Sequence, residues 1–282
     1  MKRKFIEDKA MQIVMAAATA MLFYFVGSIL YTIISKGAPS LSLSMITELP
    51  GGEFYIGKEG GLLNAIVGSL LIVGFSTVLG LIVSIPVVFY LNVYLRPRSK
   101  LGYGVRLCFD VLFGVPSIVY GAFAYVVMIA LGLKTSLMGG VLVITLLIIP
   151  IFVRSMDEVA RLMPRDILYA SFSLGATRLQ SIKVLLRQIM PGIATATLLS
   201  IGRAIGDAAA VMFTAGYTDS IPTSLSQPAA TLPLAVFFQL SSPMPEVQQR
   251  AYSAALLLTI IVLILSIGGR IISSNAARHR IK

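Results

Sequence analysis

The stretch that decides the fold is residues 137–153, LMGGVLVITLLIIPIFV, together with the polar interval 154–190 that follows it. The apolar run carries no charge, and about 17 to 25 apolar residues are enough for one helix to cross a bilayer. The interval after it contains six lysines and arginines and a regular helical pattern. A polar interval of this length between membrane-length runs predicts a segment that contacts a partner.

The composition identifies an integral membrane protein. Apolar residues make up 57% of the 282 residues and charged residues only 12%, with a mean hydropathy of +0.89. In soluble globular domains about 25% of residues are charged. Because the sequence lacks the strand-like alternation of a membrane barrel, an all-α helical bundle is predicted.

Six apolar runs are long enough to form transmembrane helices: 11–34, 62–88, 111–133, 137–153, 191–215 and 251–272. The first is too long for the apolar core of a signal peptide, so we expect an uncleaved helix. Pro86, Pro116 and Pro150 interrupt backbone hydrogen bonding within the runs. A membrane tolerates this where protein or a water-filled cavity satisfies the freed groups, so packing kinks and cavity lining both remain open.

The lysines and arginines predict the orientation. Eighteen of the 23 fall on one side, before the first run and within 96–106, 154–187 and 270–282. Cytoplasmic loops retain such residues, so both termini and the interval 154–190 are predicted to be cytoplasmic. The net charge of +11 is explained by this topology and by anionic headgroups, and no nucleic-acid partner is expected.

The interval 154–190 contains an amphipathic pattern. As one helix, residues 165–183 place five residues on a common face: Leu168, Phe172, Gly175, Leu179 and Ile182. Pro164 and Asp166 suit the start of such a helix. Periodicity alone leaves three interpretations open: a helix docked on a partner, one packed on its own protein, or one lying on the headgroups.

Two charged residues, Arg203 and Asp207, lie inside the run 191–215. An arginine at the bilayer centre costs about 2.5 to 3.5 kcal/mol on insertion scales, so it requires a partner or a wet cavity. In a continuous helix Asp207 is that partner, but such a pair contributes only about 0.2 to 0.5 kcal/mol. An additional anionic contact is therefore favoured over a purely structural ion pair. The guanidinium suits phosphate, sulfate or a carboxylate equally.

The segment ASFSLGAT at 170–177, followed by Pro191 and Gly192, resembles the EAA loop of ABC-importer permeases. In that family the loop docks into the ATPase subunit, and Tyr169 stands here where the motif has glutamate. Gly175 is expected to allow close approach of another backbone. The resemblance implies an ATPase-coupling role for Leu168, Ala170, Phe172, Gly175 and Leu179.

RAIGDAA at 203–209 resembles the RAIGETA segment of phosphate-importer permeases, with Asp207 in place of the glutamate. GVPSIVYG at 114–121 and GGLLNAIVGSL at 60–70 resemble the same family. The resemblance implies a six-helix, type I permease subunit of an ATP-driven phosphate importer in the cell membrane. Arg203 then contacts the anion, and Asp207 holds and neutralises Arg203 when the site is empty.

The resemblance also implies alternating access and three kinds of partner: a second permease subunit, an ATPase dimer and an extracytoplasmic phosphate-binding protein. The chain is then expected to contain three regions. Residues 1–61 form the first helix and outer loop, residues 62–272 form the permease core with its coupling loop 154–190, and residues 273–282 form a basic cytoplasmic tail. The chain lacks the phosphate-binding Gly-x-x-x-x-Gly-Lys-Ser/Thr loop, so ATP and Mg²⁺ are expected on the ATPase partner. With one cysteine and one histidine, neither a catalytic nor a metal site is expected.

Other functions remain open at this point: a secondary anion transporter or channel without ATP, a permease for sulfate or molybdate, and a structural subunit that anchors partners. Inverted repeats favour the secondary transporter. The sequence shows no convincing pair of related halves.

Overall fold

A computed structural model describes residues 2–51, 60–96 and 98–277. In chain order its elements are α1 (Lys2–Gly37), the 3-10 turn η1 (Ala38–Ser40), α2 (Leu43–Thr47), α3 (Leu63–Phe89), the π-helical turn η2 (Tyr90–Tyr94), α4 (Lys100–Gly114), α5 (Ser117–Ala130), α6 (Leu137–Leu162), α7 (Arg165–Ser173), α8 (Arg178–Ile205), α9 (Leu232–Leu240) and α10 (Pro245–Ala277). The prediction of an all-α fold is confirmed.

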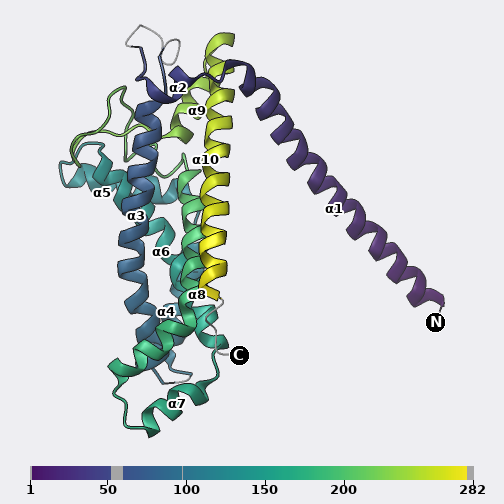
Figure 1. Ribbon diagram of the computed structural model, residues 1–282, viewed down its shortest axis with the longest axis vertical. Helices are drawn as coiled ribbons and strands as arrows, with labels where there is room; N and C mark the ends of the chain where they lie inside the picture. The colour runs from purple at the N-terminus through teal and green to yellow at the C-terminus, as the bar shows by residue number, and fades with distance from the viewer. Residues whose placement is uncertain (1, 52–59, 97, 278–282) are drawn as a thin grey trace.

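The helix α6 lies at the centre of the bundle. Of its most apolar stretch 72% is buried, the largest share among the long helices that the structure describes. It packs against α3 and α8, while α10 packs against α8 and α9 (Figure 1). A Cβ at Gly80 of α3 would lie 2.8 Å from the Phe152 ring of α6. The absence of a side chain at Gly80 therefore lets the fully buried Phe152 fill the space between these two helices.

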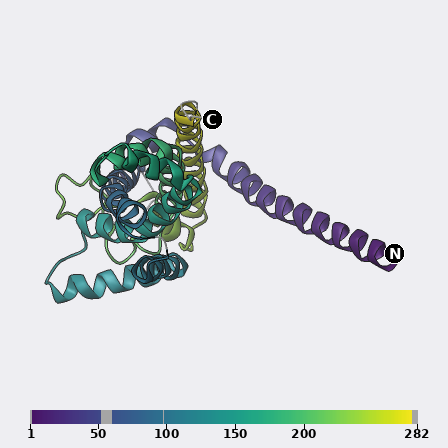
Figure 2. The same ribbon diagram turned by 90° about the horizontal axis from the view of Figure 1, so that it is seen from below.

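The helix α1 diverges from the bundle (Figures 1 and 2). None of its most apolar stretch is buried. The C-terminal end of α1 contacts α10, where the Ser253 hydroxyl donates to the Gly37 carbonyl at 2.7 Å. Apolar surface of this extent marks contact with lipid or with another subunit.

Five of the six predicted spans correspond to long apolar helices, namely α1, α3, α6, α8 and α10, although α8 ends at Ile205, within the run 191–215. The prediction of a continuous span over 111–133 is wrong, because α4 and α5 meet there at 100°. Pro116 lacks an N–H and disfavours helical backbone at Val115, whose ψ is 130°. The described residues therefore contain five spans, or six if this bent pair is one.

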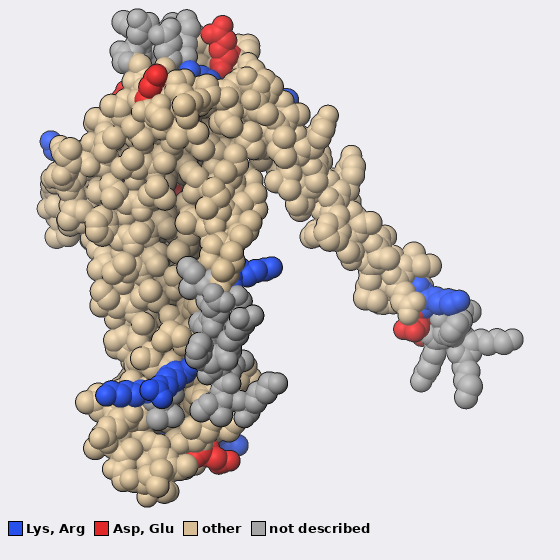
Figure 3. Space-filling model, viewed as in Figure 1, with Lys and Arg blue, Asp and Glu red and all other residues tan. Residues whose placement is uncertain are grey.

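The start of α1 and the end of α10 lie toward the α7 end of the bundle, opposite α2 and α9 (Figure 1). On the face drawn in Figure 3, charged side chains gather mainly toward the two ends, with a broad uncharged surface between them. The cytoplasmic orientation and the three regional boundaries stay predictions. Residues 52–59 of the outer loop and 278–282 of the basic tail lie outside the described residues.

Gly68→Ala is expected to lower the melting temperature of the purified protein in detergent. The added Cβ would lie 2.1 Å from the Ala230 carbonyl oxygen, and overpacking of this kind costs about 1 to 3 kcal/mol. Gly74→Ala is the matched control in the same helix, since no described residue beyond the adjacent turns of that helix lies within 4 Å of its Cβ position. Alanine is the better helix former, so this control should melt at the same or a higher temperature. Equal melting temperatures for the two variants would contradict the packing at Ala230.

Candidate functional site

The helix α8 ends at Ile205, so the predicted continuous span 191–215 is wrong over its last turns. Gly206 caps the helix, and residues 208–215 form turns closed by the Met212 N–H donating to the Ala208 carbonyl at 3.0 Å. Two physical causes act at this point. Glycine is a poor helix former, and the Asp207 carboxylate accepts the Ala210 N–H at 2.8 Å, a local contact that competes with helix continuation.

This break separates Arg203 from Asp207. Both residues are described, and no ion pair joins them. The predicted pairing is therefore wrong in this conformation, because it required one unbroken helix. Arg203 is exposed in the last turn of α8, where the helix dipole favours a cation.

The break between α4 and α5 packs directly on the break after α8. A Cβ at Gly121 would lie 2.8 Å from the Ala210 carbonyl oxygen and 2.9 Å from that of Ala209. The Tyr120 hydroxyl donates to the Leu112 carbonyl at 2.9 Å, across the bend. Irregular backbone at membrane depth is tolerated only where it is buried in protein or lines a water-filled cavity. The two sequence motifs, 114–121 and 203–209, thus form one candidate site.

Asp207 faces a small cavity between α3, the end of α8 and the segment before α9. Ser69 and Thr231 also line it, and its volume is about 10 Å³. That volume holds a single water at most. In this conformation the exposed guanidinium of Arg203, rather than the cavity, is the group available to an oxyanion.

Asp207→Ala is expected to destabilise the turn 208–215, because it removes the acceptor for the Ala210 N–H. Losing a capping acceptor costs about 0.5 to 2 kcal/mol. Asp207→Asn is the matched control, since its amide oxygen can still accept this bond and asparagine caps as well as aspartate. In detergent, the melting temperature of Asp207→Asn should be close to that of the wild type, and the melting temperature of Asp207→Ala should be lower. Equal losses in both variants would indicate that the charge matters, as an ion pair with Arg203 requires.

The region 165–183 is not the single helix that its periodicity predicts. It forms α7, a connection at 174–177, and the first turn of α8. Gly175 has φ +80°, a left-handed backbone that glycine adopts readily. Thr177 and Gln180 then form a reciprocal capping box that starts α8. The predicted common face is therefore divided between two helices.

The side chains of this region point in different directions. Leu168 is buried and lines a small cavity with Met163 and Leu185. Tyr169, Phe172, Leu174 and Leu179 are exposed, Leu174 by 89%, and we call these four the α7 surface. Ala170 is also exposed. The sequence reasoning missed Leu174, although an apolar residue directly before a glycine at a helix end is a usable signal.

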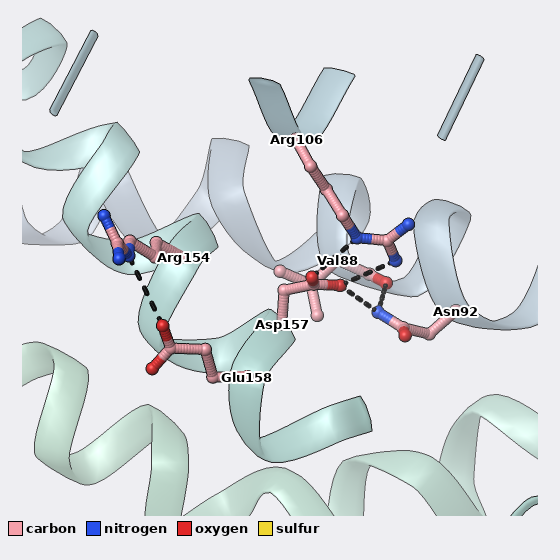
Figure 4. Close-up of polar contacts among 6 residues, drawn as sticks. All are labelled: Val88, Asn92, Arg106, Arg154, Asp157 and Glu158. Atoms are coloured by element: carbon pink, nitrogen blue, oxygen red, sulfur yellow. Dashed lines mark hydrogen bonds and ion pairs between the residues drawn. The ribbon is translucent and has the colours of Figure 1, made fainter. Parts of the chain in front are cut away.

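A buried polar cluster at the α7 end of the bundle was also missed. The carboxylate of Asp157 accepts two hydrogen bonds from Arg106, at 2.7 and 3.0 Å, and one from the Asn92 amide at 2.8 Å (Figure 4). We call Asn92, Arg106 and Asp157 the Asp157 cluster. The useful signal was Asp157 itself, an acidic residue only four positions after the apolar run 137–153.

The fold is a bundle of apolar, membrane-length helices with two packed breaks and exposed apolar side chains at its α7 end. Residues 76–275 match the family described as binding-protein-dependent transport system inner membrane component, and the chain belongs to this family. It is accordingly a multi-pass protein of the inner membrane. It is the membrane transport component, not the ATPase.

The comparisons with individual proteins agree. The chain is 36% identical over 244 residues to the phosphate transport system permease protein PstA of Pasteurella multocida, covering 86% of each. It is 35% identical to PstA of Yersinia pestis, covering 86% of this chain and 82% of the relative.

Solved structures support the fold. An inward-facing structure of the MetNI methionine ABC transporter has a TM-score of 0.63 at 21% identity, covering 76% of this chain and 95% of its own. The structure of a bacterial ABC transporter involved in the import of the acidic polysaccharide alginate also has a TM-score of 0.63, at 12% identity. The match covers 96% of this chain and 98% of the chain in that structure. The fold is that of type I ABC-importer permeases.

Proposed function

We propose that this chain is the permease subunit of an ATP-driven importer of inorganic phosphate and forms half of the translocation path by alternating access. The similarity to PstA proteins over most of the chain supports phosphate as the cargo. The observation that carries the proposal is the position of Arg203, exposed at the end of α8 beside the two packed helix breaks. Its forked donors suit the oxygens of a tetrahedral anion.

In this proposal Arg203 contacts the anion directly. Asp207 has a different role from the one its spacing suggested, because its carboxylate accepts the Ala210 N–H. It thereby fixes the turn that follows Arg203, so that the backbone beside the anion keeps a defined shape.

The α7 surface supports an ATPase partner, a PstB-like dimer on the cytoplasmic side. Four exposed apolar side chains around one short helix are typical of a protein contact. Tyr169, which replaces the motif glutamate, is 53% exposed and faces that partner. ATP and Mg²⁺ are held by the ATPase, and this chain binds no cofactor.

Two further partners complete the importer. The uncovered apolar length of α1 supports contact with lipid and with a PstC-like second permease. The opposite end of the bundle, with α2, α9 and the loop before α9, receives a PstS-like phosphate-binding protein.

The proposal is tested by reconstituting the purified four-component complex in proteoliposomes and measuring uptake of radiolabelled phosphate. We expect uptake to require enclosed ATP and to persist when ion gradients are dissipated. Excess sulfate or molybdate should not compete. Uptake that follows an ion gradient without ATP would assign the chain to secondary transport, and strong competition by another oxyanion would overturn the cargo.

A further inference from the structure

We propose that Arg178, Tyr94 and the Asp157 cluster form the connection through which movement of α7 reaches α3 and, along it, the candidate anion site. This inference rests on the proposed ATP-driven function. It assigns positioning roles to residues at the α7 end of the bundle, which do not touch the anion.

The first contact joins α7 and α8 to the turn η2. The hydroxyls of Ser171 and Ser181 are 2.8 Å apart, which links α7 to the first turns of α8. The Arg178 guanidinium donates to the Tyr94 carbonyl at 3.4 Å and lies 5.7 Å from the centre of the Tyr94 ring. Tyr94 in turn stacks on Tyr90, with ring centres 6.1 Å apart. A displacement of α8's first turn therefore acts on η2.

The second contact joins η2 to α6 and α4. The Asn92 amide donates both to the Asp157 carboxylate at 2.8 Å and to the Val88 carbonyl at 2.9 Å (Figure 4). Arg106 binds the same carboxylate through two nitrogens. Asp157 is only 6% exposed, and separating a buried carboxylate from its donors leaves a charge unsatisfied. We therefore expect the three residues of the Asp157 cluster to move together, because separating them would leave the buried carboxylate without its donors.

The third contact lies near the other end of α3. The hydroxyl of Ser69 accepts the Leu232 N–H at 2.8 Å. Ile72 and Val73 line the small cavity that Asp207 faces. Although Pro86 lies in its last turn, α3 remains one helix from Leu63 to Phe89. Displacement at η2 is therefore carried to the cavity beside Asp207.

The turn η2 is the segment of this connection whose backbone conformation can change. Its hydrogen bonds span five residues instead of four, as when the Leu95 N–H donates to the Tyr90 carbonyl at 3.1 Å. Turns of this kind occur often at functional sites. The turn η2 ends α3, since Leu95 after it is extended, so conversion to α-helical spacing would change the position of Tyr94 relative to α3. A segment with two discrete arrangements is the physical requirement for coupling between distant sites.

Asn92→Leu tests the connection, because leucine has a similar size and removes both side-chain hydrogen bonds. In the reconstituted complex we expect phosphate transported per ATP to fall about tenfold or more, while ATP hydrolysis continues; tenfold corresponds to about 1.4 kcal/mol. Glu158→Gln is the matched control. Glu158 lines the same cavity as Asp157, but its side chain is 65% exposed and forms an ion pair with Arg154, which is 44% exposed. The amount of phosphate transported per ATP by Glu158→Gln should therefore stay at the wild-type value.

A second readout does not depend on the cargo. Cys108 is the only cysteine, so Cys108→Ser gives a background for spin labels at Val78 of α3 and Leu199 of α8, both 56% exposed. We expect ATP to change the distance between the labels in the otherwise wild-type complex and not in Asn92→Leu. Arg178→Lys, which keeps the charge but loses the planar group over Tyr94, should reduce the change as well and serves if Asn92→Leu does not assemble.

The outcomes separate this inference from the proposed function. Loss of the ATP-dependent distance change in the variants supports the connection, whatever anion the complex carries. A wild-type distance change and a wild-type transport-to-ATP ratio in the variants overturn it. An unlabelled wild-type complex without ATP-driven phosphate uptake overturns the proposed function alone, and absence of any ATP-dependent distance change in the otherwise wild-type complex overturns the connection.

Discussion

Arg203→Ala is expected to abolish phosphate uptake in complexes that still assemble and still hydrolyse ATP. The side chain is exposed at the end of α8, so its removal leaves no buried partner unsatisfied. Loss of two charge-assisted hydrogen bonds of about 1.5 to 3 kcal/mol each corresponds to at least about a hundredfold in anion affinity. Uptake of radiolabelled phosphate into proteoliposomes measures the effect.

Arg203→Lys is the control for this prediction. Lysine keeps the positive charge but lacks the planar fork that binds two oxygens together, so intermediate uptake is expected. Copurification of all partners with both variants confirms assembly. Wild-type uptake by Arg203→Ala would remove Arg203 from the anion path.

Gly175→Val is expected to reduce uptake tenfold or more while ATP hydrolysis continues. Gly175 has φ +80°, which costs other residues about 1 to 2 kcal/mol and is a genuine outlier for β-branched side chains. In the variant, the backbone between α7 and α8 must therefore adopt another conformation, which changes the orientation of the α7 surface relative to α8. The ratio of phosphate transported to ATP hydrolysed in proteoliposomes measures the uncoupling.

Gly175→Asn separates two explanations for this glycine. Among the described residues, apart from its two chain neighbours, none lies within 4 Å of a Cβ built there, so the backbone conformation is the requirement that the structure supplies. Asparagine tolerates this conformation and should retain most of the uptake. Equal loss in Gly175→Asn and Gly175→Val would instead favour close approach of a partner's backbone, and normal coupling in Gly175→Val would refute both explanations.

The helical bundle followed from composition and run length alone, because the bilayer imposes both. The breaks did not follow, since an apolar run reads the same whether its helix is straight or bent. Pro116 marked one bend, and its effect was left open between a kink and cavity lining. The end of α8 at Ile205 was missed because glycine is also common in unbroken membrane helices.

The sequence motifs supplied the residues of the candidate site, which stay a prediction, and they did not supply the contacts of these residues. The spacing of Arg203 and Asp207 gave a pair only if residues 203–207 formed one helical turn. The capping bond from the Ala210 N–H to Asp207 replaced it. Similarly, Leu168 shares a helical face with Phe172 in the pattern, yet Leu168 is buried and Phe172 is exposed.

The Asp157 cluster lay beyond the reach of sequence patterns. Asn92 and Arg106 are separated from Asp157 by 65 and 51 positions, and local periodicity carries no information on which distant helices pack together. Only the arrangement of η2, α4 and α6 brings the three residues into one place.

The central claim, that the anion path passes the two packed helix breaks, is tested most directly by a structure of the assembled importer trapped with phosphate. We expect a tetrahedral anion in contact with the Arg203 guanidinium, beside the turn that Asp207 caps. A phosphate bound elsewhere along the path, with the Arg203 side chain facing lipid, would contradict the account.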